Sequence, residues 1–436
     1  MGKSKWTQPL IAVGILAALA FWGMGLTDKL PIQLFAGVML GYILTRSRYG
    51  FAGGVKRLYM RGEGSLTRAL IVLVAVTAIV FMGFQWSAHI GGALPAYLAQ
   101  EGDKVIPGTQ NVYFTNIATI VGAFIFGIGM ILAGGCGSGT LADLGEGEGR
   151  ALIAFIFFVI GAAPGHYARW WVDQTAVGKV GFRIYLPEHF GYVGALLITL
   201  AILAAIYALT LWYENRRKRE GTYIDPVGDY EDFEKPLETN SKEIKFFSYE
   251  TYHKIFVERW SFLVGSFALA IGAIFVMAGT HKAWGVSTPL ISLNVALFRG
   301  FIDFPQEAFA SFLKKSDEGI LQLLQDGGTV RNIGMFFGCA VAFLLANRFK
   351  FNFSFNKKDG LYFAFGGLLL GFGSRFALGC NLGAFYSSVT NFSMSGWVFM
   401  IFMALGGIFA LKVFAGRVCT VGTLRKDQLA QLKNKK

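Results

Sequence analysis

Residues 127–139 read Gly-Ile-Gly-Met-Ile-Leu-Ala-Gly-Gly-Cys-Gly-Ser-Gly, and residues 371–383 read Gly-Phe-Gly-Ser-Arg-Phe-Ala-Leu-Gly-Cys-Asn-Leu-Gly. Both segments contain the pattern G-x-G-x5-G-C-x2-G, and their cysteines, Cys136 and Cys380, are 244 positions apart (380 − 136 = 244). Five identities at one spacing indicate that the chain contains two related halves, each with its own Gly-Cys motif.

Long apolar segments surround both motifs. Of the 436 residues, 54% are hydrophobic and only 15% are charged, whereas soluble domains carry about 25% charged residues. A helix that spans a bilayer needs roughly 17–25 apolar residues. We therefore predict an all-α integral membrane protein with about ten spans, at residues 9–27, 31–46, 69–84, 112–133, 151–165, 191–213, 260–280, 332–347, 361–379 and 397–414.

Four clusters of basic residues orient these spans. They lie within residues 46–68, 216–219, 348–358 and 417–436. Because cytoplasmic loops carry an excess of Lys and Arg, we predict that all four clusters and both termini are cytoplasmic. Residues 289–303 must then enter and leave the membrane on one side. The same bias accounts for the net charge of +13, so the expected partner is the lipid bilayer and not a nucleic acid.

Under this topology, the spans that precede the two cysteines run in opposite directions. Inverted-topology repeats with broken helices near the midplane are a common transporter plan. We predict an N-terminal repeat over residues 1–213, a cytoplasmic linker over 214–250 and a C-terminal repeat over 251–436, with short re-entrant helices. The polar linker is either a plain exposed connection or a docking site for a cytoplasmic protein.

The cysteines and motif glycines each allow two interpretations. Small residues let membrane helices approach closely, and a buried cysteine is commonly an inert packing residue. Recurrence at equivalent points favours a functional role for Cys136 and Cys380, whereas we interpret Cys339 and Cys419 as packing residues. The four cysteines and five histidines show no metal-ligand spacing, so we predict neither a metal site nor a cofactor.

Several segments together resemble the YeeE/YedE sulphur-transport family. They are Gly-Ser-Arg-Phe-Ala-Leu-Gly-Cys-Asn-Leu-Gly-Ala at 373–384, Ser-Gly-Trp at 395–397, Gly-Gly-Cys-Gly-Ser-Gly at 134–139, Arg-Ser-Arg-Tyr-Gly-Phe-Ala-Gly-Gly at 46–54 and Trp-Gly-Val-Ser at 284–287. The resemblance covers nearly the whole chain and implies uptake of a sulphur-containing anion past buried cysteines in the bacterial inner membrane.

One position departs from the family pattern. Members that transport thiosulfate carry a cysteine in the first motif, where this chain has Gly50. A relay of three thiols is therefore missing, which favours a related sulphur or selenium species over thiosulfate. The length, the linker and the glycine-rich first motif look closest to the branch associated with selenium metabolism.

The implied site combines soft and cationic groups. A neutral thiol is a weak donor and a polarisable acceptor, and backbone N–H groups at the helix starts after each cysteine could receive an anion. We expect Cys136 and Cys380 to face one central constriction from opposite sides. The predicted pathway residues are Cys136, Cys380, Gly135, Gly137, Gly139, Gly379, Asn381, Gly383, Arg375 and Arg48.

Two of these arginines have alternative roles. A charge within the membrane is a functional candidate by default, so Arg375 either attracts the anion or holds its hairpin by pairing with carbonyls or a carboxylate, for which Asp143 is the candidate. Arg48 either draws anions or marks the inner face.

Three functions are compatible with these features. The leading hypothesis is a permease, and not an enzyme, for a small sulphur or selenium anion. The alternative is a membrane-bound transfer protein that forms a Cys persulfide or selenosulfide; this would need an activated thiolate, and no basic residue adjoins Cys136 in the sequence. The third is a scaffold that passes selenium to a cytoplasmic sulphur- or selenium-handling protein through the linker.

Overall fold

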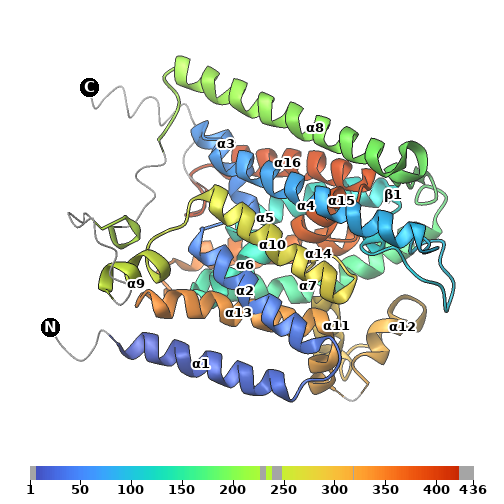
Figure 1. Ribbon diagram of the computed structural model, residues 1–436, viewed down its shortest axis with the longest axis horizontal. Coiled ribbons are helices and arrows are strands. Elements are labelled where there is room, and N and C mark those ends of the chain that lie inside the picture. Colours follow the sequence, from blue (N-terminus) through green and yellow to red (C-terminus); the bar gives the residue numbers. More distant parts are fainter. Residues whose placement is uncertain (1–5, 226–231, 238–247, 318, 422–436) are drawn as a thin grey trace.

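Long helices packed side by side make up the protein, as the computed structural model shows for residues 6–225, 232–237, 248–317 and 319–421 (Figure 1). Ten helical segments in this part of the chain are long and apolar enough to cross a membrane. The prediction of an all-α integral membrane protein with about ten spans is therefore confirmed.

The structure consists of long helices with short helices between them, and both Gly-Cys motifs lead into a short helix. The α-helices are α1 (Thr7–Met24), α2 (Leu30–Arg46), α3 (Phe51–Arg61), α4 (Ser65–Ile90), α5 (Ile117–Ala133), α6 (Gly137–Gly145), α7 (Gly149–Gln174), α8 (Leu186–Arg219), α9 (Tyr249–Phe256), α10 (Phe262–Thr280), α11 (Thr288–Phe298), α12 (Gln306–Lys314), α13 (Gly327–Leu345), α14 (Lys357–Phe376), α15 (Ser387–Thr390) and α16 (Met394–Val413). Short 3-10 helices are η2 (Thr109–Asn111), η4 (Asp232–Glu234) and η5 (Ile320–Gln325), η6 (Asn381–Tyr386) is a π-helix, and β1 (Thr115–Asn116) pairs antiparallel with β2 (Gly181–Phe182).

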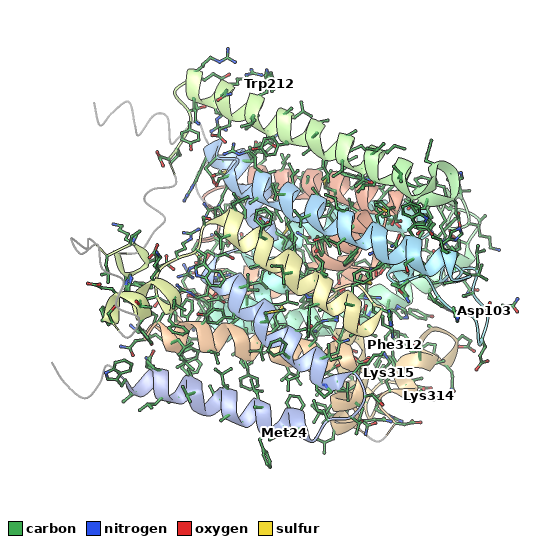
Figure 2. All side chains as sticks on the ribbon, in the orientation of Figure 1. Met24, Asp103, Trp212, Phe312, Lys314 and Lys315 are labelled. Carbon is green, nitrogen blue, oxygen red and sulfur yellow. The ribbon has the colours of Figure 1, made fainter. Side chains whose placement is uncertain are left out.

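The peripheral helices expose large apolar side chains. Trp212 on α8 is 54% exposed and Met24 at the end of α1 is 78% exposed, and both point away from the bundle (Figure 2). An apolar surface of this extent is unusual for a soluble protein, and it suits contact with lipid tails.

The helices that lead into the two motifs, α5 and α14, cross through glycines. A Cβ added at Gly122 would lie 2.7 Å from the backbone nitrogen of Ala377, and one added at Gly129 would lie 2.6 Å from that of Leu370. Residue numbers increase along α5 while those of the contacting residues of α14 decrease, so the two helices are antiparallel. Equivalent helices of an inverted-topology repeat are expected to run in opposite directions.

Both motifs break a helix at the cysteine. Gly134, at φ 81°, ends α5, and Cys136 is the N-cap of α6. Leu378, at φ 65°, follows α14, and Cys380 is the N-cap of η6. The short helices predicted after the cysteines are therefore present, inside the protein, where irregular backbone is tolerated at membrane depth.

The segment between α10 and α13 begins and ends at one end of the bundle. Helix α10 is antiparallel to α2, because Gly265 lies near Ser47 and the later Gly279 lies near the earlier Ile32. Helix α13 is parallel to α2, because Arg331 lies near Gly37 and Met335 lies near Gly41. Helices α10 and α13 are thus antiparallel, as the prediction that residues 289–303 enter and leave on one side requires.

The basic clusters of the described residues gather at one end of the bundle. Residues 46–61 contact the end of α8, the end of α13 and the described end of the chain, whereas residues 422–436 of the basic tail lie outside the described residues. The contacts are Arg217 Nη1 to Tyr59 O at 3.0 Å, the Arg48 guanidinium over the Phe343 ring at 5.0 Å and the Lys56 ammonium to Thr420 O.

Helix α8 continues past the predicted start of the linker. Glu214 and Arg217 are buried: Glu214 accepts a hydrogen bond from Gly64 N at 3.2 Å, and Arg217 donates to Met60 O at 3.2 Å. The first residues of the predicted linker are therefore packed against the end of α3 and the turn that leads into α4.

Candidate functional site

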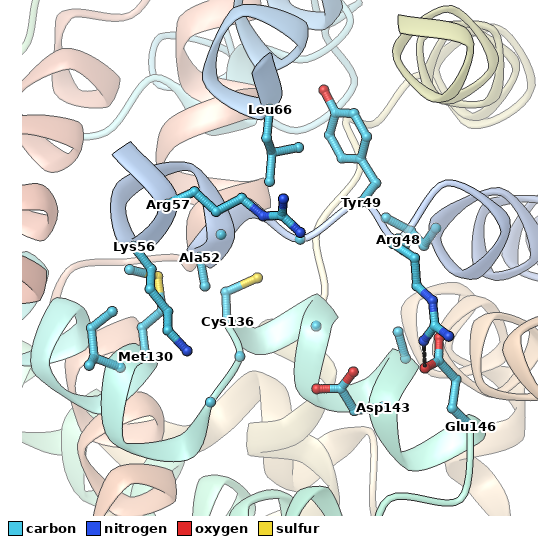
Figure 3. Close-up of a pocket in the computed structure, with 18 of the residues that line it drawn as sticks. Arg48, Tyr49, Ala52, Lys56, Arg57, Leu66, Met130, Cys136, Asp143 and Glu146 are labelled. Carbon is cyan, nitrogen blue, oxygen red and sulfur yellow. Dashed lines mark hydrogen bonds and ion pairs between the residues drawn. The ribbon is translucent and has the colours of Figure 1, made fainter. Parts of the chain in front are cut away.

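A cavity of about 450 Å³ is lined by residues of the basic cluster at 46–61, so it lies at that end of the bundle. Figure 3 shows the cavity in close-up. Its wall comes from the end of α2, from α3, from the Gly-Cys turn and from α6, and it includes Gly50, Gly135 and Gly139. The Cys136 side chain points into it from the turn, toward Ala52 and Arg57 on α3 (Figure 3).

Cys136 is buried, and the local sequence places its thiol in the wall of the cavity. The left-handed Gly134 reverses the chain, and the Thr140 N–H donates to the Cys136 carbonyl at 2.7 Å to start α6. Sγ lies 3.3 Å from Ser138 Oγ, and a Cβ on Gly139 would lie 3.6 Å from Sγ. Because Gly139 has no side chain, no Cβ packs against this face of the sulfur, although Cys136 is only 1% exposed.

The Cys380 motif lies directly behind this turn. Its first helical hydrogen bond, from Ala384 N to Cys380 O, is 2.7 Å long and repeats the bond at Cys136 244 positions earlier (384 − 140 = 244). A Cβ added at Gly137 would lie 3.5 Å from Cys380 Cβ. The structure thus brings the two motifs into contact. Both cysteines are buried, but Cys136 lines the cavity and Cys380 does not.

The other predicted residues of the second motif shape the turn. A Cβ at Gly379 would lie 2.6 Å from Ala384 N, and the Gly383 carbonyl accepts from Asn111 Nδ2 at 3.0 Å. Asn381 is buried, with Nδ2 3.6 Å from Met130 Sδ. The cavity wall does not include Gly379, Asn381 or Gly383.

Arg375 lies away from the cavity, and the proposed pairing with Asp143 is wrong. Arg375 is buried, and its Nη1 donates to Thr288 Oγ1 at 3.0 Å. Asp143 instead accepts from Arg150 Nη2 at 2.8 Å. The reason is that α6 directs Asp143 toward the start of α7, while Arg375 ends α14 beside the start of α11.

Arg48 lines the cavity and holds two carboxylates. Its Nη1 lies 3.2 Å from Glu146 Oε2, and its Nε lies 2.9 Å from Glu234 Oε1. Glu146 follows α6, and Glu234 comes from the segment predicted as the linker. The predicted linker therefore reaches the cavity, which no sequence pattern indicated.

Among the residues that the structure describes, more cationic than acidic side chains line the cavity. Such a concave surface focuses its field and attracts anions. Sequence analysis missed most of these residues, because it used the basic cluster at 46–68 only to orient the spans. The i, i+4 spacing of Arg57 and Arg61 after the first motif could have indicated two arginines on one face of a helix next to the site. The cationic wall residues among the described residues are Arg48, Lys56, Arg57, Arg61, Arg150 and Arg259, and the acidic ones are Asp143, Glu146 and Glu234.

Glu146 makes this charge sensitive to pH. Burial raises the pKa of Glu146 to about 7, and the nearby Asp143 carboxylate raises it further. The Arg48 cation and the hydrogen bond from Thr45 act in the other direction and lower it. The Thr45 hydroxyl donates to Glu146 Oε1 at 2.8 Å. Protonation of Glu146 near neutral pH removes one negative charge from the cavity wall.

The remaining cysteines differ from each other. Cys339 is buried and its thiol donates to Gly41 O at 3.2 Å, as expected for a packing residue. Cys419 is exposed, so its interpretation as a packing residue is wrong. It follows α16 in a turn that lies outside the helix bundle's packed interior.

A multi-pass helical bundle with inverted motifs and a cationic cavity beside a buried cysteine defines a membrane transporter for an anion. The chain matches the family model for sulphur transport over residues 46–409. It belongs to that sulphur transport family, which confirms the resemblance found in the sequence. Its assignment to the selenium-associated branch stays a prediction.

Similarity to curated proteins extends over most of the chain. It is 26% identical over 380 residues to the thiosulfate transporter TsuA of Spirochaeta thermophila, an alignment that covers 86% of this chain and 95% of that protein. It is 25% identical over 377 residues to TsuA of Escherichia coli, with 86% and 91% covered. Over 80 residues it is 39% identical to the probable transporter YedE of Escherichia coli, with 18% and 20% covered.

Proposed function

We propose that this protein takes up a small sulphur- or selenium-containing anion across the bacterial inner membrane, past Cys136 and Cys380. The observation that carries the proposal is the position of the buried Cys136 in the wall of a cationic cavity, in contact with the second Gly-Cys motif. The cations concentrate the anion, and the thiol supplies a soft contact to a terminal sulfur or selenium.

Weak contacts suit this task. A pathway must bind its substrate strongly enough to admit it and weakly enough to release it. A neutral thiol and the N–H groups at the start of α6 meet this condition better than a direct lysine pair would. Arg375, on the side of the second motif, is proposed to attract the anion at the other end of the pathway.

The topology of the proposal follows the positive-inside rule. The end with the basic clusters and both termini faces the cytoplasm, so the Cys136 cavity is the inner vestibule. Residues 1–213 and 251–436 are the two repeats, and residues 214–250 link them. The contact between Glu234 and Arg48 supports a role for this linker at the vestibule, where it is a candidate contact for a cytoplasmic sulphur- or selenium-handling protein.

Gly50 is proposed to set the substrate preference. It lines the cavity, and a Cβ at this position would meet nothing within 4 Å. The missing thiol could therefore be restored without strain. The chain as it stands is proposed to prefer a species other than thiosulfate, and selenium compounds are the first candidates.

A transport assay with purified protein tests this function. Proteoliposomes that contain the wild-type chain or the Gly50→Cys variant are exposed to radiolabelled thiosulfate, selenite and related anions. We expect the wild type to take up at least one of them and Gly50→Cys to gain thiosulfate uptake. The absence of uptake for every anion would refute the transport function, and unchanged thiosulfate uptake in the variant would refute the role of Gly50.

One observation favours a second function, a sulphur or selenium transfer protein. Lys56 and Arg57 line the cavity that Cys136 also lines, and Cys136 is the N-cap of α6. A close cation or a helix N-terminus favours a reactive cysteine, and α3 brings cations to this cavity, while the burial of Cys136 opposes ionisation of the thiol. Mass spectrometry of the purified protein after exposure to a sulphur or selenium donor distinguishes the two functions, because only transfer requires a stable adduct on Cys136.

A further inference from the structure

A buried arginine of the second motif lies at the start of a helix. Arg375, near the end of α14, is 5% exposed, and its Nη1 donates to Thr288 Oγ1 at 3.0 Å and to Ser287 Oγ at 3.5 Å. Ser287 is the N-cap of α11, and Thr288 is the first residue of this helix. We propose that the oxygen atoms of an oxyanion bind between Arg375 and the start of α11.

The positive charge of Arg375 is not neutralised within the part of the chain that the structure describes. Arg375 forms no ion pair there, its hydrogen bonds come from Nη1, and its Nε is buried without a partner. Arg46 and Arg331 are also buried, but each of them donates from both Nη1 and Nη2 to oxygen acceptors. A charge inside a membrane protein is costly unless it is paired. Arg375 is therefore suited to a ligand that brings negative charge.

The start of α11 adds a second positive feature at the same place. The first N–H groups of a helix have no partner within the helix, and the helix dipole places partial positive charge there. A cationic side chain is normally stabilised at the C-terminus of a helix and not at its N-terminus. An anion between Arg375 and α11, which has 11 residues, would be stabilised by the guanidinium and by the helix together.

The donors around this place are suited to oxygen atoms. Ser287 and Thr288 accept hydrogen bonds from Arg375, so their hydroxyl hydrogens remain available, and neither hydroxyl has an acceptor among the described residues. A hydroxyl group can donate while it accepts, and the guanidinium fork matches a pair of oxygen atoms. Oxyanions of sulfur or selenium therefore fit this site, whereas hydrosulfide and hydroselenide, which have no oxygen, do not.

The loop before α11 is tied to the short helices that follow Cys380. Ser387 Oγ donates to Trp284 O at 2.6 Å, and the rings of Trp284 and Tyr386 meet edge-on with centroids 6.2 Å apart. Trp284 is 1% exposed, and its indole N–H has no acceptor in the described part of the chain. The start of α11 and the turn at Cys380 thus form one packed unit with Arg375.

The site lies far from the end of the bundle that carries the basic clusters. Asp359, in the first turn of α14, accepts from Cys419 N at 3.1 Å at that end. Arg375 comes 16 residues later (375 − 359 = 16), which is about 24 Å along a helix. Figure 1 shows α11 and α12 at the opposite end of the bundle from α9. The site therefore suits the other end of the pathway; this role rests on the proposed transport function, whereas anion binding itself does not.

The thermal stability of the purified full chain tests the site. Melting temperatures in detergent are measured with increasing sodium thiosulfate, selenite or chloride at equal ionic strength, for the wild type, Arg375→Gln and Thr288→Val. Thr199→Val on α8 is the matched control for a buried threonine. Arg331→Gln is the matched control for a buried arginine, because Arg331 donates to Gln33 Oε1 at 2.9 Å. The Cys136 cavity is the same in every variant, so differences between variants report the Arg375 site.

We expect thiosulfate or selenite to raise the wild-type melting temperature above its value in chloride, and both controls should keep the full rise. Thr288→Val should need about fivefold more anion for half of the rise, which corresponds to about 1 kcal/mol for one hydrogen bond, and Arg375→Gln should lose more of the rise than Thr288→Val. In chloride alone, Arg375→Gln should melt no lower than the wild type, because it removes an unpaired buried cation. An arginine that only held the hairpin together would give a lower melting temperature when replaced.

The outcomes separate this site from the transport function. Equal rises in the wild type and in Arg375→Gln, or an equal effect of chloride and the oxyanions, would overturn the proposal. A rise that depends on Arg375, in a protein that takes up none of the anions, would support the site and refute transport. Uptake of an anion without any such rise would support transport and refute the site.

Discussion

The glycine at position 139 determines how much of the Cys136 thiol reaches the cavity. A Cβ at this position would lie 3.6 Å from Sγ, an ordinary van der Waals contact, and would meet no other neighbour within 4 Å. The Gly139→Ala variant should therefore fold normally, with a gain of up to about 1 kcal/mol in helix propensity within α6. Its methyl group should cover one side of the sulfur.

The size of the effect follows from the contact that the methyl group displaces. A neutral hydrogen-bond contact of the thiol contributes about 0.5–1.5 kcal/mol, which corresponds to a loss of about two- to tenfold in binding. We expect uptake of a labelled sulphur anion at low concentration to fall by this factor. The melting temperature should not fall, because the new methyl group meets no backbone atom.

Two assays measure the change. Cellular uptake is normalised to the amount of protein in the membrane, and modification of Cys136 by a small thiol reagent is followed in a Cys419→Ser background, because Cys419 is exposed. Gly83→Ala is the matched control, since a Cβ there meets nothing within 4 Å. Unchanged uptake together with unchanged thiol modification in Gly139→Ala would refute the reasoning.

Three further predictions follow from the cavity and from the packing of the helices. Uptake should increase as the pH falls from about 8 to about 6, because Glu146 gains a proton and the cavity becomes more positive; Glu146→Gln should abolish this dependence. Because the folded protein binds the Glu146 proton more tightly than the unfolded chain does, the folded state loses stability as the pH rises through about 7. The wild-type melting temperature should therefore also fall between about pH 6 and about pH 8, and that of Glu146→Gln should not. Glu234→Gln should lower the KM for the anion by about fivefold, because one fewer carboxylate competes for Arg48, and a unit charge at such range is worth about 1 kcal/mol. Gly129→Ala should lower the melting temperature by the equivalent of about 1–3 kcal/mol, because its methyl group would meet the backbone of Leu370.

Each of these predictions has an outcome that contradicts it. A flat pH profile in the wild type would show that Glu146 does not titrate in this range. An unchanged KM in Glu234→Gln, relative to Glu250→Gln on the exposed start of α9, would show that Glu234 does not compete with the anion. A melting temperature for Gly129→Ala equal to that of Gly83→Ala would show that the α5–α14 crossing has room to adjust.

The fold was largely predictable because its determinants are local. The length of an apolar segment specifies a span, and the charge of a loop specifies its side. The repeated Gly-Cys pattern also predicted correctly that Cys136 and Cys380 lie in turns that start short helices. Of the motif glycines, Gly129 serves the close crossing of α5 and α14, while Gly139 lies beside the Cys136 sulfur.

The site was less predictable because several distant segments build it. Arg48, Glu146 and Glu234 are far apart in the sequence and meet only in the folded chain. The expected pair of Arg375 with Asp143 failed for the same reason, since the turn after Cys136 directs α6 toward α7. Proximity in a membrane bundle depends on the helix crossings, which single-residue patterns do not specify.

The central claim is that the substrate passes Cys136 and Cys380, and uptake by serine variants tests it most directly. Uptake of the transported anion is measured for Cys136→Ser, Cys380→Ser and the buried control Cys339→Ser at matched protein levels. The account predicts a clear loss in the first two variants and wild-type uptake in the control. Wild-type uptake in both Cys136→Ser and Cys380→Ser would contradict it.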